Sequence, residues 1–138
     1  MSRRIPRRPA ATTAKEAVLR LGQAFDDADP ALAAGAVLFP YQHAVDFRGK
    51  TSVHVYDQSR FAEEVGERPG GKRARRARTD LTIEVLSPTA ALVREDIEFT
   101  SPDGDTGAQR ALHTVVRSGT GWAVTASWYS EAPEWLVS

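Results

Sequence analysis

The beginning of the chain shows the spacing of hydrophobic residues that is typical of α-helices. From residue 13 to 28, apolar side chains recur three or four positions apart, which places them on one face of a helix. Thr13 and Glu16 have the spacing of a capping box, which commonly begins a helix. Asp29 and the proline after it predict a second, short helix over 30–38, because aspartate caps a helix and proline fits its first position.

The pattern then changes to the alternation of β-strands. Residues 43–47 and 51–56 alternate polar and apolar side chains, and the three residues between them can form a turn, which predicts a β-hairpin. Asp57 can cap a third helix, in which Phe61 and Val65 lie one turn apart on the same face. The glycine after Val65 is expected to end this helix.

The second half of the chain is predicted to form strands. Four alternating stretches are separated by segments rich in glycine, proline, serine and aspartate, which favour turns. The predicted strands are 79–87, 91–100, 108–118 and 122–131. Helices followed by a series of strands indicate an α+β domain, in which the helices cover one side of a curled antiparallel sheet.

Length and composition are those of an ordinary globular domain. The chain has 138 residues, of which 41% are hydrophobic and 26% charged, so we assign residues 13–138 to one folded domain. There is no cysteine, which excludes disulfides and thiol nucleophiles. No apolar run approaches the roughly 20 residues that cross a bilayer, and residues 1–8 lack the apolar segment of a secretory signal. We therefore expect no membrane association and a cytoplasmic location.

The charges are unevenly distributed, although they sum to zero. Residues 1–8 contain four arginines and residues 68–78 contain six basic side chains, and neither stretch contains an acid. Such runs can bind polyanions, but both lack the aromatic side chains that stack on bases. We expect residues 1–12 to form a flexible basic tail, the second run to be a solvated loop, and nucleic acid not to be a partner. Polyanion binding through the second run is the alternative.

Two polar residues fall on strand faces that are otherwise apolar. Glu95 shares its face with Val93 and Ile97, and His113 shares its face with Val115. A carboxylate among aliphatic side chains is costly unless it is paired, and an enclosed histidine can act as a general acid or base. A glutamate and a histidine inside one pocket could therefore transfer protons. The alternatives are a structural histidine and a glutamate that lies in solvent near a strand edge.

The turn between the last two strands sets which side chains are neighbours. A two-residue turn that begins at Gly119 would pair His113 with Ala126. This register places Trp128 on the face of His113, where its ring could line a ligand pocket or pack in the core. The partner of Glu95 would then be His113 or one of the two arginines of the 108–118 strand.

The order of elements resembles that of the nuclear transport factor 2-like superfamily. The similarity rests on the Ala-Asp-Pro-Ala-Leu entry to the second helix at 28–32 and on the closing run Gly-Trp-Ala-Val-Thr-Ala-Ser-Trp-Tyr-Ser-Glu at 121–131, and it covers about residues 13–132. This superfamily includes ketosteroid isomerases, SnoaL-like polyketide cyclases and scytalone dehydratase, together with proteins that only bind ligands. The resemblance implies a conical barrel of curled, mixed sheet covered by three N-terminal helices. It also implies a pocket between sheet and helices, and a homodimer through the outer face of the sheet.

The resemblance also implies site residues. Ketosteroid isomerases carry a catalytic acid on the first strand, before a glycine, and Asp46 is the acid in the similar stretch of this chain. The alternation, however, places Asp46 on the face opposite Phe47. The tyrosine and the acid that serve these isomerases as oxyanion donors are replaced here by Leu21 and Val116, which argues against a steroid isomerase. The side chains available as substitute donors are Tyr41, Tyr56 and His113.

We therefore expect a cofactor-independent enzyme that isomerises, cyclises or dehydrates a small hydrophobic, oxygenated molecule, such as a polyketide or terpenoid intermediate, by proton transfer. Glu95 or Asp46 would be the base, and His113 the acid or oxyanion donor. The three histidines are widely spaced in the sequence and predict no metal site. A noncatalytic ligand-binding or assembly module of the same fold is the alternative. The expected walls of the pocket are Phe25, Phe47, Tyr41, Tyr56 and Trp128.

Overall fold

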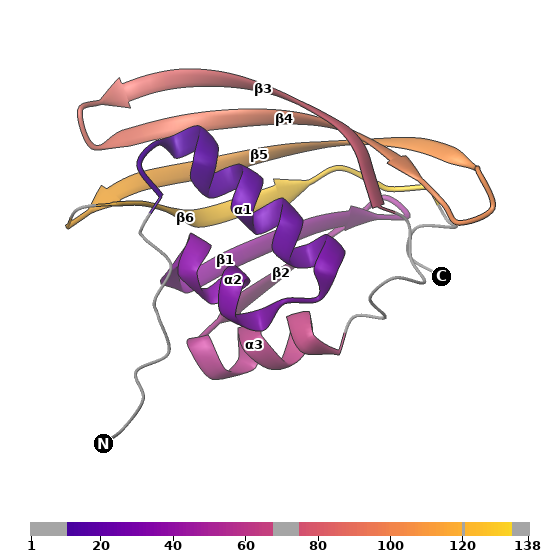
Figure 1. Cartoon of the computed structure of the whole chain (residues 1–138), viewed down its shortest axis with the longest axis horizontal. Helices are drawn as coiled ribbons and strands as arrows, with labels where there is room; N and C mark the ends of the chain where they lie inside the picture. The colour runs from indigo at the N-terminus through magenta and orange to yellow at the C-terminus, as the bar shows by residue number, and fades with distance from the viewer. Residues whose placement is uncertain (1–10, 68–74, 120, 134–138) are drawn as a thin grey trace.

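The computed structural model describes residues 11–67, 75–119 and 121–133, which form helices followed by a six-stranded sheet (Figure 1). The predicted basic tail lies outside these residues except for its last two, and so does the basic segment 68–74. The elements are α1 (Ala14–Asp27), α2 (Pro30–Ala36), β1 (Val37–Phe47), β2 (Lys50–Tyr56), α3 (Gln58–Gly66), β3 (Arg75–Ser87), β4 (Ala90–Thr100), β5 (Thr106–Ser118) and β6 (Gly121–Tyr129).

The helices begin where the sequence predicts. The Thr13 hydroxyl accepts a hydrogen bond from the backbone N–H of Glu16 at 3.1 Å, which caps α1. The Asp29 carboxylate accepts one from the N–H of Leu32 at 3.1 Å and caps α2. The helix α2 ends before the predicted residue 38, because the chain from Val37 onward already belongs to strand β1. No helix among the described residues is long and apolar enough to cross a membrane.

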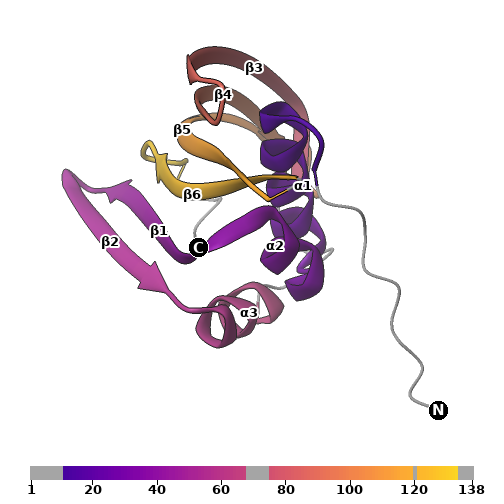
Figure 2. The same cartoon turned by 90° about the vertical axis from the view of Figure 1, so that its left-hand side faces the viewer.

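The strands form one mixed sheet in the order β2-β1-β6-β5-β4-β3. The neighbours β1 and β6 run parallel, and all other neighbours run antiparallel. Figure 2 shows that the sheet curls around the helices, with α1 lying against its concave, inner face. The core lies between this face and the apolar side of α1, which buries Val18, Leu21 and Phe25.

The packed domain begins earlier than the sequence pattern suggests. Ala11, which the pattern assigns to the flexible tail, is buried, and its carbonyl accepts a hydrogen bond from the N–H of Trp122 at 2.9 Å. The strand β3 likewise begins at Arg75 and not at residue 79. Part of the predicted basic loop is therefore strand.

The β1–β2 turn differs from its prediction by one residue. Arg48 and Gly49 both have positive φ, 49° and 77°, and they form a two-residue turn in which Asp46 pairs with Thr51. The expected three-residue turn is therefore wrong. The alternation gave no sign that an arginine would adopt the left-handed conformation.

A β-bulge in β6 changes which side chains face the interior. Val115 pairs with Val124 as predicted, but His113 pairs with Ser127 and not with Ala126. Thr125 is the additional residue, and its hydroxyl donates to the backbone carbonyl of Thr114 at 3.2 Å. Because one extra residue reverses the alternation, every side chain beyond the bulge lies on the face opposite to its predicted one.

Candidate functional site

The three histidines lie in one row across the sheet, although they are far apart in the sequence. His54 on β2 pairs with His43 on β1, and His43 pairs with Ser127 on β6. Ser127 in turn pairs with His113 on β5. Neighbouring strands are about 4.8 Å apart, so the side chains of this row follow one another along the inner face. We call His54, His43, Ser127 and His113 the histidine row.

His113 is hydrogen-bonded at both ring nitrogens. Its Nε2 lies 2.9 Å from Oε1 of Glu95, and its Nδ1 lies 2.6 Å from Oγ of Ser127. Glu95 and His113 are each 1% exposed and Ser127 is 4% exposed. When Glu95 is ionised and the imidazole is neutral, Nε2–H donates to the carboxylate, and the Ser127 hydroxyl donates to Nδ1. The carboxylate therefore fixes the tautomer, and Nδ1 is the basic atom.

Arg76 on β3 supplies positive charge behind Glu95. Its Nε lies 3.8 Å from Oε2 of Glu95, and its Nη1 lies 2.7 Å from Oδ1 of Asp26 and 3.0 Å from the carbonyl oxygen of Gly22. Neither Oε2 of Glu95 nor Nε of Arg76 has a hydrogen-bond partner among the described residues. Negative, positive and negative charges thus alternate from α1 to His113, and the guanidinium offsets part of the cost of burying two carboxylates.

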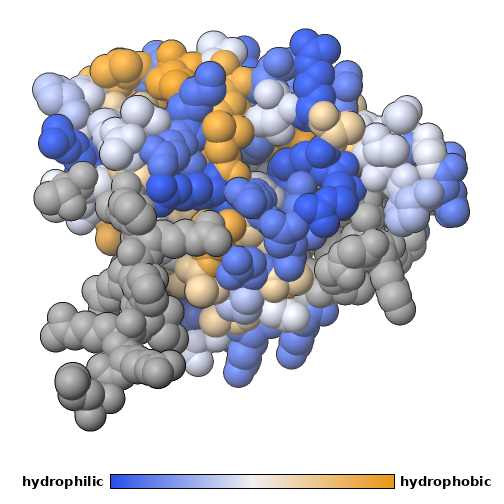
Figure 3. All heavy atoms as spheres, in the orientation of Figure 1, coloured by the Kyte–Doolittle hydropathy of each residue, from blue (hydrophilic) through white to orange (hydrophobic). Residues whose placement is uncertain are grey.

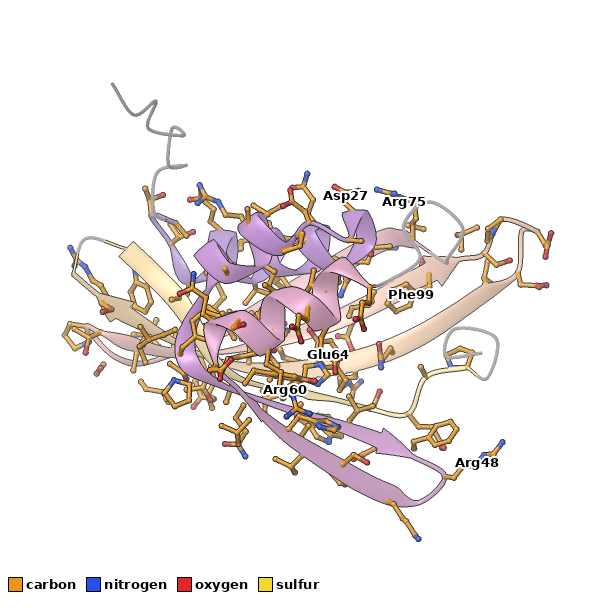
Figure 4. All side chains as sticks on the ribbon, turned by 90° about the horizontal axis from the view of Figure 1, so that it is seen from below. Asp27, Arg48, Arg60, Glu64, Arg75 and Phe99 are labelled. Carbon is orange, nitrogen blue, oxygen red and sulfur yellow. The ribbon has the colours of Figure 1, made fainter. Side chains whose placement is uncertain are left out.

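A second arginine–aspartate pair lies beside the first. Arg75 Nη2 is 2.5 Å from Oδ1 of Asp27 at the end of α1, and Figure 4 shows these two side chains next to each other. This hydrogen bond and the carboxylate charge raise the pKa of the Arg75 guanidinium. Both pairs tie the beginning of β3 to the end of α1. The basic run is thus, in the part that the structure describes, paired with acids and not wholly solvated.

Aromatic rings surround the middle of the histidine row. His43 is half-buried, and its ring centroid lies 5.0 Å from that of Tyr129, 6.1 Å from Tyr41 and 6.3 Å from Phe25. The ring of Tyr129 is also 5.7 Å from that of His113. The predicted wall residues Phe25, Tyr41 and Tyr56 therefore lie together in the interior, on the same side of the sheet as the row.

Two predicted site residues lie elsewhere. Asp46 and Trp128 are on the outer face of the sheet, where the indole Nε1 of Trp128 donates to Oδ1 of Asp46 at 3.1 Å, and the Thr51 hydroxyl donates to the same oxygen at 2.6 Å. The prediction that Trp128 shares a face with His113 is wrong, because the bulge at Thr125 turns it outward. The sheet separates both side chains from the histidine row.

Phe47 lies at the rim of the curled sheet. It is exposed and lines a hollow of about 460 Å³ together with Arg48, Ala108 and the segment 131–133. The backbone N–H of Arg48 donates to the Glu131 carboxylate at this hollow. This hollow lies at the end of β1, two residues beyond the Val45–Tyr129 pair.

Sequence reasoning overlooked four residues of this arrangement. His43 lies two residues from Tyr41 and two from Val45, and this spacing could have placed it with them on the inner face. Ser127 and Tyr129 follow the bulge, and no pattern in the sequence predicted the bulge. Arg76 belongs to the basic run, which the sequence analysis assigned to a solvated loop. Among the described residues, no group of three or more histidine, cysteine, aspartate or glutamate side chains could hold a metal ion.

Comparison with known proteins gives relatives in structure and not in sequence. No protein-family model matches the chain, and no curated protein matches it in sequence. A ketosteroid isomerase-like protein from Erwinia carotovora atroseptica matches with a TM-score of 0.63 at 18% identity, over 85% of this chain and 92% of that one. An NTF2-like protein of unknown function from Silicibacter pomeroyi matches with a TM-score of 0.58 at 14% identity, over 86% and 92%. The chain has the nuclear transport factor 2-like fold.

The same fold occurs in a candidate scytalone dehydratase from Novosphingobium aromaticivorans, which matches with a TM-score of 0.66 at 12% identity, over 87% of this chain and 83% of that one. These likenesses confirm the predicted α+β fold with a curled mixed sheet. The sheet of this chain is not closed, because β2 and β3 form its two edges. At such identities the likeness shows the fold and not the activity.

Proposed function

We propose that this protein is a cofactor-independent enzyme that isomerises, cyclises or dehydrates a hydrophobic, oxygenated small molecule by proton transfer. The observation that carries the proposal is the buried Glu95–His113–Ser127 chain of hydrogen bonds, with distances of 2.9 and 2.6 Å. A base held by a carboxylate on one side and a hydroxyl on the other is the arrangement that general acid–base catalysis needs.

The hydrogen bonds define a route for the proton. When the Ser127 oxygen takes a proton from a bound molecule, its own proton passes to Nδ1 of His113. The resulting imidazolium is stabilised by the ionised Glu95 carboxylate, which accepts from Nε2–H. Return of the proton to another atom of the same molecule completes an isomerisation, and its return to a departing hydroxyl completes a dehydration. Asp46 has no part in this route, because it lies across the sheet.

The surroundings of the row favour a hydrophobic, oxygenated substrate. The rings of Phe25, Tyr41, Tyr56 and Tyr129 offer apolar surface, and the tyrosine hydroxyls can bind oxygen atoms. His43 is half-buried among these rings, next to Ser127 along the row, and it is a second group able to carry a proton. We propose that the substrate lies against Tyr129, between His43 and His113.

Exchange of carbon-bound protons tests this proposal without knowledge of the natural substrate. The probe is 1-tetralone, a hydrophobic ketone whose α-protons exchange with D₂O at a rate that proton NMR measures. We expect the wild-type protein to accelerate the exchange. We expect His113→Gln and Ser127→Ala to lose about 10²–10⁴-fold of that acceleration, the usual contribution of an acid–base group. His54→Gln is the matched control, because His54 is the exposed histidine of the same row.

The control variant should retain the wild-type rate, and circular dichroism establishes that each variant is folded. A folded His113→Gln protein that exchanges as fast as the wild type would contradict the proposal. Saturable binding of 1-tetralone without any acceleration by the wild type would instead favour the noncatalytic ligand-binding module.

We further propose that two copies associate through the outer face of the sheet. Val53 and Val55 on β2 are 54% and 64% exposed there, and Leu38 and Leu112 on the same face are also exposed. Apolar side chains gathered on one sheet face are typical of an interface. The resemblance to the nuclear transport factor 2-like superfamily implies the same surface.

A further inference from the structure

The strand β3 leaves one edge of the sheet open. It is thirteen residues long, and β4 is its one strand neighbour among the described residues. Figures 1 and 2 show it as the outermost strand. An open edge presents unpaired backbone N–H and C=O groups, and proteins normally shield it. Register irregularities lie near both ends of β3, so the regular part of the edge is Arg78–Val85.

Apolar side chains are exposed along this edge. Ile83 is 41% exposed, Val85 is 75% exposed and Leu86 is 53% exposed. Figure 3 shows hydrophobic atoms gathered at the upper left, where β3 turns into β4. An open edge with uncovered apolar side chains favours pairing with another strand.

The order of charges along β3 indicates which strand would pair with its open edge. Arg78, Asp80, Thr82 and Glu84 alternate with the inner-facing residues and share the outer face. If a second copy of β3 runs antiparallel about a two-fold axis at Leu81, Arg78 of each copy lies opposite Glu84 of the other. We propose that two copies of this chain pair in this way through β3, so that their sheets join into one.

Neighbouring registers are less favourable. Pairing must keep inner residues opposite inner residues, so the axis can lie only at a residue, and the nearest alternatives are Asp80 and Thr82. An axis at Asp80 places two Asp80 carboxylates opposite each other. An axis at Thr82 places Asp80 opposite Glu84. Like charges directly opposite each other destabilise a sheet, whereas the Leu81 axis pairs opposite charges twice.

The same register covers two of the three exposed apolar residues, Ile83 and Val85. On the inner face, Leu81 lies opposite Leu81 of the second copy, and Ile83 lies opposite its Thr79. Val85 approaches Ala77 of the second copy at the end of the regular segment. The edge is thus complementary to itself in charge and in apolar surface, which is the property that a two-fold interface requires.

A single cysteine tests the register directly, because the chain has no cysteine of its own. Side chains directly opposite on antiparallel strands have Cβ atoms about 4.5–5.5 Å apart, close to the reach of a disulfide. We therefore expect Leu81→Cys to form disulfide-linked dimers under mild oxidation. Val85→Cys is the matched control, because Val85 is more exposed but lies opposite Ala77. Equal cross-linking of both variants, or none for Leu81→Cys, would overturn the proposal.

Charge reversal provides a second, independent measurement. Arg78→Glu and Glu84→Arg should each raise the dissociation constant of the β3 contact by about tenfold or more, because two symmetric pairs become like-charged. The double variant R78E/E84R should restore the wild-type value. Sedimentation velocity measures the association, and circular dichroism controls for folding. Double-variant association as weak as that of the single variants would refute the register.

The β3 contact and the outer-face contact are separate surfaces. A Val55→Lys change, which disrupts the outer face, should therefore leave the Leu81→Cys cross-link intact. A wild-type chain that sediments as a monomer at every concentration, and whose Leu81→Cys variant does not cross-link, would rule out a second copy. An extended segment of another protein would then be the occupant of the edge.

Discussion

Arg76 carries the positive charge between two largely buried carboxylates. Its side chain is 12% exposed, and it lies 2.7 Å from Asp26 and 3.8 Å from Glu95. The attraction within such a group roughly balances the cost of removing the charges from water. Loss of the arginine removes the attraction and leaves both carboxylates in place. Arg76 is therefore a positioning residue, which holds Glu95 against His113 without touching the imidazole.

Replacement of Arg76 should destabilise the fold strongly. We expect Arg76→Met to lower the free energy of unfolding by about 3–5 kcal/mol, because it leaves uncompensated charge in the interior. Arg60→Met, on the exposed surface of α3, is the control, and it should change the free energy of unfolding by about 0.5 kcal/mol or less. Urea denaturation measures both variants. Similar losses in the two would show that Asp26 and Glu95 do not depend on the arginine.

At the scale of the element, the Glu16 carboxylate binds the residues on both sides of it at the beginning of α1. The backbone N–H and the hydroxyl of Thr12 donate to the Glu16 carboxylate at 3.0 and 2.8 Å, and Arg20 pairs with it from one turn further along. The Thr12 backbone hydrogen bond is the largest of the causes that lower the pKa of Glu16. The ionised carboxylate is therefore bound more favourably in the folded chain than in the unfolded one.

The lowered pKa fixes the sign of a pH effect. Glu16 contributes stability above the ordinary pKa of a glutamate, and this contribution disappears as the pH falls through the lower pKa of the folded state. Glu16→Gln should therefore be less stable than the wild type at pH 7, and the difference should shrink on acidification. Thermal unfolding of both proteins over a pH series measures it. Glu64→Gln, on the exposed surface of α3, is the control for the removal of one surface carboxylate. A difference that grows on acidification would contradict the assignment.

Local patterns predicted the elements well, because each depends on neighbouring residues. The caps at Thr13, Asp29 and Asp57 all accept the hydrogen bonds that their positions predict. Register was harder to predict, because it depends on turns and bulges. A positive φ at Arg48 and one extra residue at Thr125 were enough to change the neighbours of Asp46 and to move Trp128 to the outer face.

At the scale of the whole molecule, the candidate site depends on contacts that no local pattern contains. The order of elements was sufficient to predict the fold, and the apolar faces of two strands were sufficient to single out Glu95 and His113. His43 joins them only because β1 and β6 pair in parallel, although more than 80 residues separate His43 from Ser127. Parallel pairing between distant segments leaves no trace in a single sequence. The sequence therefore predicted two of the residues of the site, but it did not predict how they are arranged.

The proposed association of two copies through the outer face of the sheet can be tested by mutation. The outer face exposes Val53 and Val55, and their replacement by lysine places charge in the proposed contact. We expect V53K/V55K to lower the mass of the assembly in sedimentation equilibrium. Leu19→Lys should not, because Leu19 is an exposed apolar residue of α1, on the other side of the molecule. If V53K/V55K keeps the wild-type mass and Leu81→Cys still cross-links it, then β3 alone joins the copies, and the outer face is free for another partner.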